Sequence, residues 1–198
     1  MEKEIVPKDS RYVPFAQQKS CCAPTSISMI MYKNKIPLLP QELLGYHLGL
    51  TVEKECKNLF WNSKMVGERP PSGYGTRIVL NKYNPNTVFP KLKIPLKMIY
   101  HPISTFNDID FKKFMVDAVK KDKDVCVCFN HGVLKGERAG NGHVCVLDRI
   151  YPSKGLVRII DPSVNQPKWR IVRISLLKKA MEVHGDDKMG GFWEFKKV

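Results

Sequence analysis

The chain has 198 residues, with 33 basic and 19 acidic side chains, and its formal net charge is +14. This length fits one domain, and the hydrophobic fraction of 43% is sufficient for a sizeable core. No apolar run approaches the ~20 residues that span a bilayer, and the first residues include no segment of the signal-peptide type, so we expect a soluble, cytoplasmic protein.

The positive charge would attract nucleic acid, anionic lipid or acidic peptide. However, the basic residues are scattered, often as Lys-Lys pairs, and no block of about five like charges occurs. We therefore favour a solvated basic surface over a nucleic-acid-binding surface. The sequence gives no basis for predicting an oligomeric state.

The N-terminal half predicts helices. Residues 1–12 are polar and predict a loose arm, and a helix follows Cys22 and ends near Asn34. Pro24 suits the first turn of this helix, and its apolar residues recur at helical spacing. A second short helix is predicted from Pro40.

A third helix is predicted from 51–55, which resembles a capping box, through Trp61. Residues 62–94 are rich in Gly, Pro and Asn, and 68–75 is a loop by composition. We find no internal repeat and no low-complexity tract.

The C-terminal half predicts a sheet with helices between its strands. Helices first and an antiparallel sheet after them indicate an α+β protein, with a helical half at about 13–94 and a sheet half at about 95–198. We predict strands at 95–100, 124–130, 143–150, 156–160 and 190–195, and helices at 110–121 and 174–183.

The six cysteines are too sparse to form a disulfide scaffold, so we expect reduced thiols. Cys126 and Cys128 alternate along a predicted strand, and with His131 and Cys145 they make a metal site conceivable. No Cys-x-x-Cys pair occurs, and buried free cysteine behaves as a small apolar residue. We therefore expect these thiols to pack in the core, with no metal and no cofactor.

Cys22 is the candidate nucleophile. It lies at the start of a predicted helix, where the helix dipole and the free N–H groups favour a thiolate. Its neighbour Cys21 would point elsewhere. A packed structural cysteine is the alternative, because buried free thiols are common.

His143 is the candidate base, because it begins a predicted strand while its side chain can reach into a cleft. The strand returns through a hairpin turn, so Asp161, at the end of the next strand, should lie at the same edge. A carboxylate there could orient the imidazole and stabilise its cation. The alternatives are a core histidine and a turn-forming aspartate. His131 is a weaker candidate base, because no acid follows it in a hairpin.

An oxyanion formed by attack of the Cys22 thiolate requires hydrogen-bond donors. The backbone N–H of Cys22 is one candidate donor, and the side-chain amide of Gln18 is a second. Gln17 is an open alternative to Gln18.

These segments resemble the papain-like bacteriocin-leader (double-glycine) peptidase family and its stand-alone relatives. The resemblance rests on Gln before Cys-Ala-Pro-Thr-Ser, on Gly-His-Val-Cys-Val-Leu-Asp, and on Ile-Ile-Asp-Pro-Ser. It implies a papain-like fold in which a helical half and a sheet half meet at the cleft. The implied roles are Cys22 as nucleophile, His143 as base, Asp161 as orienting acid and Gln18 as oxyanion donor. The chain departs from the family at Ala23, where the family usually has Gly, and in its short Gln-to-Cys spacing.

The expected function is therefore hydrolysis of a peptide or other amide through a thioester intermediate, with a peptide or protein as substrate. Two alternatives use the same residues differently. The thioester could pass to an amine in an acyl-transfer reaction, or the scaffold could be a non-catalytic basic binding module.

Overall fold

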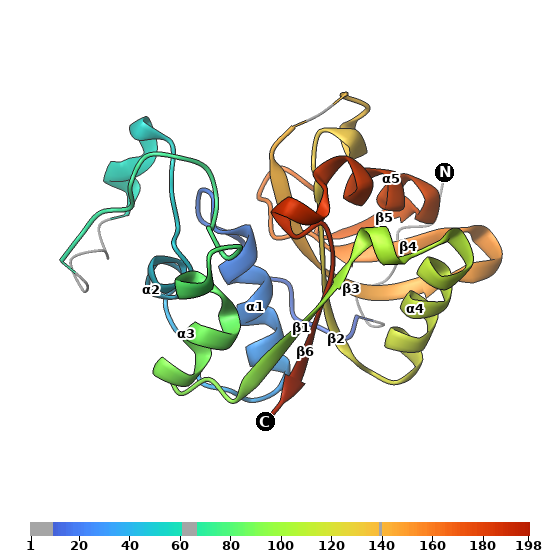
Figure 1. Ribbon diagram of the computed structural model, residues 1–198, viewed down its shortest axis with the longest axis horizontal. Helices are drawn as coiled ribbons and strands as arrows, with labels where there is room; N and C mark the ends of the chain where they lie inside the picture. The colour runs from blue at the N-terminus through green and yellow to red at the C-terminus, as the bar shows by residue number, and fades with distance from the viewer. Residues whose placement is uncertain (1–9, 61–66, 139) are drawn as a thin grey trace.

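The computed structural model describes residues 10–60, 67–138 and 140–198 of the chain. Within these residues, six strands form one antiparallel sheet in the spatial order β1-β6-β2-β3-β4-β5 (Figure 1). The strands are β1 (Leu96–Pro102), β2 (Asp124–Asn130), β3 (Gly142–Tyr151), β4 (Leu156–Ile160), β5 (Trp169–Arg173) and β6 (Gly191–Lys197).

Helices cover both faces of this sheet, so the molecule has an α+β architecture. In Figure 1, α1, α2 and α3 lie to one side of the sheet, and α4 and α5 lie to the other. The helices are α1 (Cys22–Lys33), α2 (Gln41–His47), α3 (Pro85–Lys91), α4 (Asp108–Lys120) and α5 (Ile174–His184). The predicted α+β class is confirmed.

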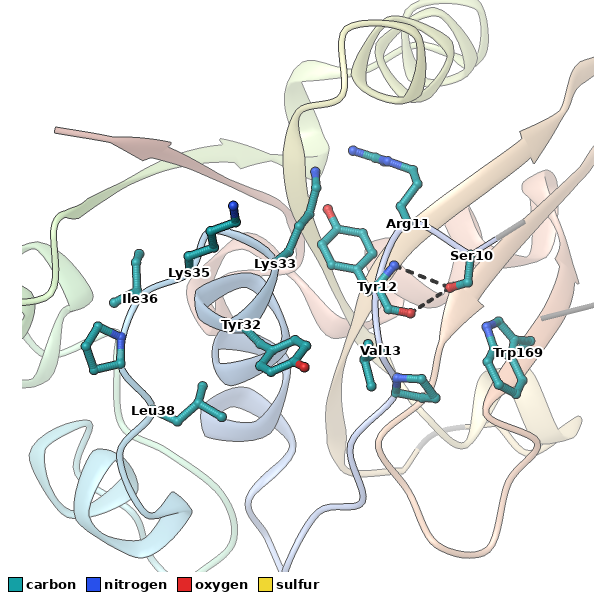
Figure 2. Close-up of a pocket in the computed structure, with 12 residues that line it drawn as sticks. Ser10, Arg11, Tyr12, Val13, Tyr32, Lys33, Lys35, Ile36, Leu38 and Trp169 are labelled. Atoms are coloured by element: carbon teal, nitrogen blue, oxygen red, sulfur yellow. Dashed lines mark hydrogen bonds between the residues drawn. The ribbon is translucent and has the colours of Figure 1, made fainter. Parts of the chain in front are cut away.

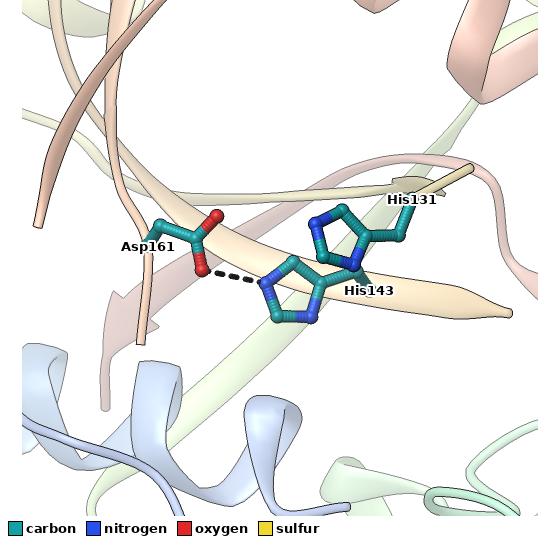
Figure 3. Close-up of side chains that lie close together, drawn as sticks. All are labelled: His131, His143 and Asp161. Atoms are coloured by element: carbon teal, nitrogen blue, oxygen red, sulfur yellow. Dashed lines mark hydrogen bonds and ion pairs between the residues drawn. The ribbon is translucent and has the colours of Figure 1, made fainter. Parts of the chain in front are cut away.

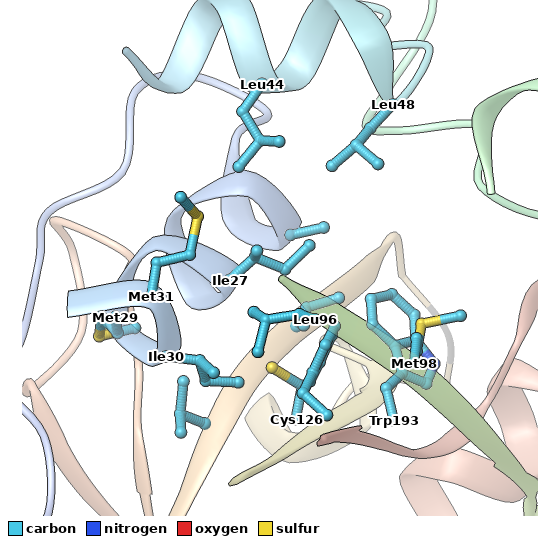
Figure 4. Close-up of a cluster of buried hydrophobic side chains, with 14 of the residues drawn as sticks. Ile27, Met29, Ile30, Met31, Leu44, Leu48, Leu96, Met98, Cys126 and Trp193 are labelled. Carbon is cyan, nitrogen blue, oxygen red and sulfur yellow. The ribbon is translucent and has the colours of Figure 1, made fainter. Parts of the chain in front are cut away.

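The two sheet faces bury separate clusters of side chains, as the alternation of residues along a strand requires. On β2, Cys126 and Cys128 belong to the cluster that includes Ile27 and Ile30 of α1. Figure 4 shows Cys126 within this cluster. The alternate residues of β2 join α4 and α5 on the other face. All residues of β2 are consequently buried, and its cysteines pack in the core as expected.

The predicted third helix is wrong in type. Residues Lys54–Leu59 form a 3-10 helix without a side-chain cap. Its N-cap is Glu53, and Thr51 lies before the helix in an isolated bridge, where its backbone N–H and its hydroxyl both donate to the carbonyl of Gly75. The predicted end of this helix at Trp61 lies outside the described residues.

One α-helix and one strand of the structure are absent from the sequence prediction. Helix α3 begins in the segment rich in Gly, Pro and Asn, with Asn84 as N-cap accepting from the N–H of Asn86 and Pro85 in the first turn. Such an Asn-Pro start is a recognised helix signal that the surrounding composition obscured. Strand β5 is the other element, and it pairs only with β4 at the sheet edge.

Residues 10–12 are held against the sheet, so the prediction of a loose arm over 1–12 is wrong there. Tyr12 is only 4% exposed, and its hydroxyl donates to Asp124 at 2.8 Å. The backbone N–H of Arg11 donates to Asp148 at 2.7 Å. The acceptors lie more than 100 positions away in sequence, so no local pattern reveals them. Residues 1–9 lie outside the described residues.

None of the helices in the described part of the chain has the length and apolar character needed to cross a membrane.

Candidate active site

Cys22 is the first residue of α1, and Cys21 occupies the N-cap position without a side-chain cap. The two neighbouring thiols point into different surroundings. Cys21 is fully buried with Leu50, Val52 and Phe60. Cys22 is 9% exposed and lines a cavity that His143 also lines. The thiol that faces the cavity is therefore that of Cys22.

Side chains of α1 and α2 hold the loop that precedes Cys22. Gln41 donates to the carbonyl of Ala16 at 2.8 Å and accepts from the backbone N–H of Gln18 at 2.9 Å. The Thr25 hydroxyl lies 2.7 Å from both the Cys21 carbonyl and the Gln41 side-chain oxygen. This bracing fixes where the loop enters the helix.

The register of β3 and β4 brings His143 and Asp161 together. Val146 on β3 is opposite Ile160 on β4, so the residue after β4 lies near the start of β3. The Nε2 atom of His143 lies 2.7 Å from Oδ1 of Asp161. Both side chains are buried, with 6% and 0% exposure.

Asp161 is surrounded by hydrogen-bond donors. Its Oδ1 also accepts from the Ser163 backbone N–H at 2.9 Å, and its Oδ2 accepts from Arg170 at 3.3 Å. Burial alone would raise the pKa of this carboxyl. The hydrogen bond and charge of His143, the Ser163 N–H and the Arg170 charge outweigh that effect, and the pKa falls to about 2.

These contacts fix the tautomer of His143. An ionised carboxylate only accepts hydrogen bonds, so Nε2 carries the proton that is shared with Asp161. Nδ1 is then the ring nitrogen left for a thiol. Burial lowers the pKa of His143, but its hydrogen bonds with Asp161, Cys145 and Cys22 hold that pKa above its ordinary value.

Cys145 is a second thiol beside the imidazole, two positions after His143 on β3. It is fully buried in the cluster on the α4–α5 face. Burial raises its pKa to about 12, so it stays protonated at neutral pH. A carbonyl substrate needs access to the nucleophile, and among the two thiols near His143 this condition favours Cys22.

His131 stacks on His143, with ring centroids 4.6 Å apart. One ligand atom each from His131, His143 and Asp161 lie within 4.8 Å of one another, which is metal-binding spacing (Figure 3). Arg170, however, contacts both Nε2 of His131 at 3.3 Å and Asp161. A guanidinium that already binds two of the three groups disfavours a second cation among them, because like charges repel.

His131 is accordingly a neutral hydrogen-bond acceptor for Arg170. Burial, followed by the charges of His143 and Lys135, lowers its pKa to about 4. A pKa near 4 makes His131 a poor base at neutral pH, which favours His143 for that role.

Two cavities meet at His143. One has a volume of about 290 Å³ and includes Cys22, and the other has a volume of about 320 Å³ and includes Gln17 and Gln18. A larger cavity, of about 850 Å³, lies between residues 10–14, 32–38 and Trp169 (Figure 2). That cavity contains none of the candidate catalytic side chains.

The two glutamines before Cys22 differ in their surroundings. Gln18 is exposed. The backbone N–H of Gln17 donates to the carbonyl of Pro162 at 2.9 Å, which ties the loop to the residue after Asp161. The side-chain oxygen of Gln17 is buried and has no hydrogen-bond partner among the described residues.

Several supporting residues were not identified from the sequence. Arg170 comes from β5, which no pattern predicted, and Gln41 acts across a separation of more than 20 residues. Cys145 was expected only as a core or metal-binding thiol. The available signal was its position two residues after His143 on a predicted strand, which places both side chains on the same face.

No protein-family model matches the sequence, and a search of curated proteins gives no match. Among solved structures, the fold is similar to that of a proposed C39-like peptidase from Bacillus anthracis. The TM-score is 0.57 at 16% sequence identity, and the similarity covers 94% of this chain and 95% of that one. The chain therefore has the papain-like fold of a C39-like peptidase, as the sequence resemblance implied.

Proposed function

We propose that this protein is a cysteine peptidase in which Cys22, His143 and Asp161 form the catalytic triad. The observation that carries the proposal is the buried 2.7 Å bond between His143 and Asp161, which leaves Nδ1 for the Cys22 thiol at the start of α1. The similarity in fold to a C39-like peptidase supports a peptide as substrate.

In the proposed reaction, Nδ1 of His143 takes the thiol proton, and the Cys22 sulfur attacks the carbonyl carbon of the scissile amide. Collapse of the tetrahedral intermediate breaks the C–N bond, and His143 gives its proton to the leaving amine. A water molecule then attacks the thioester, with His143 again as base, and releases the carboxylic acid and the free thiol. Asp161 holds the imidazole in the required tautomer and stabilises its cation.

The oxyanion requires donors, and the backbone N–H of Cys22 is one of those left free at a helix start. For the second donor, the surroundings favour Gln17 over Gln18. Both glutamines line a cavity that His143 also lines, but the side-chain oxygen of Gln17 is buried, whereas Gln18 is exposed. We therefore propose Gln17 as the side-chain donor.

Replacing Gln17 with alanine is expected to lower kcat about 10²–10³-fold, because one oxyanion donor is lost. The matched variant Gln18→Ala should change kcat less than about threefold. Steady-state kinetics on a cleaved peptide measures both. The reverse order of effects would reassign the donor to Gln18.

Alkylation of the thiols tests the proposal directly. Iodoacetamide at pH 7, followed by peptide mapping, should label Cys22 first, because His143 accepts its proton and the cavity admits the reagent. The other buried thiols should react slowly, since burial raises the pKa of each of them: Cys21, Cys126, Cys128 and Cys145.

Cys56 is the informative competitor in this experiment, because it is more exposed than Cys22 but lies beside Glu53 rather than a histidine. Faster labelling of Cys56, or equal labelling of all six thiols, would count against an activated Cys22. A His143→Ala variant should lose the preference for Cys22 and leave the labelling of Cys56 unchanged.

A further inference from the structure

The two cavities that meet at His143 have different linings, and Tyr74 lines both of them. Tyr74 belongs to a loop that is fixed by bridges from Thr51 to Gly75 and from Val52 to Ser72. A peptide bound across the site would therefore place one side chain in each cavity, on either side of the His143 imidazole.

The cavity of about 320 Å³, here called the polar cavity, is lined mainly by polar side chains that include Ser20, Lys135, Asn165 and Gln166. No acidic side chain of the described residues lines it. Its surface offers hydroxyl, amide and ammonium donors. Because no carboxylate of the described lining accepts from these donors, the cavity suits a ligand that accepts hydrogen bonds.

Ser20 is the strongest sign that the polar cavity binds a ligand. Its side chain is buried, with 5% exposure, and its hydroxyl has no hydrogen-bond partner among the described residues. An unsatisfied buried hydroxyl is destabilising, so a partner is expected when the site is occupied. The side chain lies two residues before Cys22, close to the proposed reacting bond.

The charge in the polar cavity favours a carboxylate over a neutral partner. Lys19 is already paired with Glu53 at 3.0 Å. Lys135 has no ion-pair partner in the described part of the chain, so its ammonium is available to an anion. The net charge of +14 would also draw acidic peptides toward the protein.

The cavity of about 290 Å³, here called the apolar cavity, has contrasting walls. Most of its exposed lining is apolar, with Ile78, Val79, Val144 and Trp193 beside Cys22. Arg77, His184, Asp187 and Lys188 also line this cavity. The indole N–H of Trp193 donates to the carbonyl of Met189 at 3.0 Å, so its polar atom is already satisfied. The apolar side chains beside Cys22 suit an aliphatic group, because burying apolar surface there is favourable.

We infer that the site selects peptides with a carboxylate side chain on one side of the scissile bond and an aliphatic side chain on the other. The carboxylate binds in the polar cavity, at Ser20 and Lys135, and the aliphatic group binds in the apolar cavity. This inference rests on the proposed peptidase function and names its substrate class.

Internally quenched peptides test the inference. Leu is kept on one side of the scissile bond and Glu or the isosteric Gln is placed on the other, in both orders. We expect kcat/KM for the Glu peptide to exceed that for the Gln peptide about tenfold in one of the two orders. The preference should shrink in 0.5 M salt, because exposed ion pairs are screened. Equal rates for Glu and Gln in both orders would overturn the inference.

A pair of charge-reversal variants locates the preference. Lys135→Glu should abolish or reverse the preference for Glu over Gln. Lys154→Glu is the matched control, because this exposed lysine lies in the turn after β3, at the end of the strand away from His143. It makes the same change in net charge and should keep the preference. An equal effect of the two variants would reduce the preference to overall charge and overturn the assigned subsite.

Binding to a Cys22→Ala variant separates this inference from the proposed function. Titration calorimetry should show tighter binding of the Glu peptide than of the Gln peptide, with the difference lost on adding Lys135→Glu. That result, without turnover by the unmodified protein, would sustain the carboxylate subsite and contradict the peptidase function. Turnover without any preference for Glu would do the reverse.

Discussion

A Cys22→Ala variant is expected to lose peptide hydrolysis by about 10³-fold or more, because no other group can form the thioester. The fold should persist, since the change removes one sulfur atom from a side chain that already borders a cavity. Mass spectrometry of the products from a mixed peptide library measures the loss, and circular dichroism with thermal unfolding checks the fold.

The adjacent thiol provides the control. Cys21→Ala truncates a fully buried side chain and should lower the free energy of unfolding by about 1 kcal/mol, yet it should leave turnover nearly intact. Full activity in Cys22→Ala would show that this sulfur does not carry the reaction. Loss of activity in both variants with loss of the fold would indicate that the thiols act structurally.

The second large effect is expected at Asp161. Replacing it with alanine leaves the side chains of His143 and Arg170, which are 6% and 12% exposed, without their shared carboxylate. Breaking a buried ion pair costs about 3–5 kcal/mol, so the free energy of unfolding should fall by that amount. kcat should fall about 10²-fold or more, because the imidazole loses its orienting partner. Urea unfolding and steady-state kinetics measure the two effects.

Asp161→Asn separates orientation from charge. The carboxylate accepts from His143 and Ser163 with one oxygen and from Arg170 with the other. An amide has only one oxygen, so its NH₂ must face a donor on one side or the other. We expect an intermediate loss of activity. Activity equal to that of the unmodified protein would show that Asp161 does not position the base.

The acid dependence of stability gives an independent measure. The pKa of Asp161 is about 2 in the folded protein and 3.8 in its ordinary state. Its contribution is therefore complete above about pH 5 and is lost as the pH falls toward 2. Asp161→Asn should show a shallower decrease in stability over this range, in urea titrations at several pH values.

The main strands and α1 could be predicted because their patterns are local. Residues 124–130 alternate between two buried faces, and the turn after β3 returns β4 antiparallel to it. Pairing by that hairpin predicts from the sequence alone that His143 lies near Asp161. The predicted contact between them is therefore a consequence of chain connectivity over fewer than 20 residues.

The supporting residues could not be predicted because their partners are distant in sequence. The segment of β5 reads Trp-Arg-Ile-Val-Arg, and its charges resemble those of a surface turn until the sheet edge and Asp161 are in place. The third predicted helix failed for a similar reason. Thr51 is held in an isolated bridge to Gly75, more than 20 positions away, and the helix begins only at Lys54.

The strand order has a consequence for how the molecule is assembled. Strand β6 contains residues 191–197, yet it lies between β1 and β2 in the interior of the sheet. During synthesis, both of those strands keep an open edge until residues 191–197 leave the ribosome. Unpaired edges of this kind invite association with other chains. Premature termination upstream of β6 would therefore yield an aggregation-prone product.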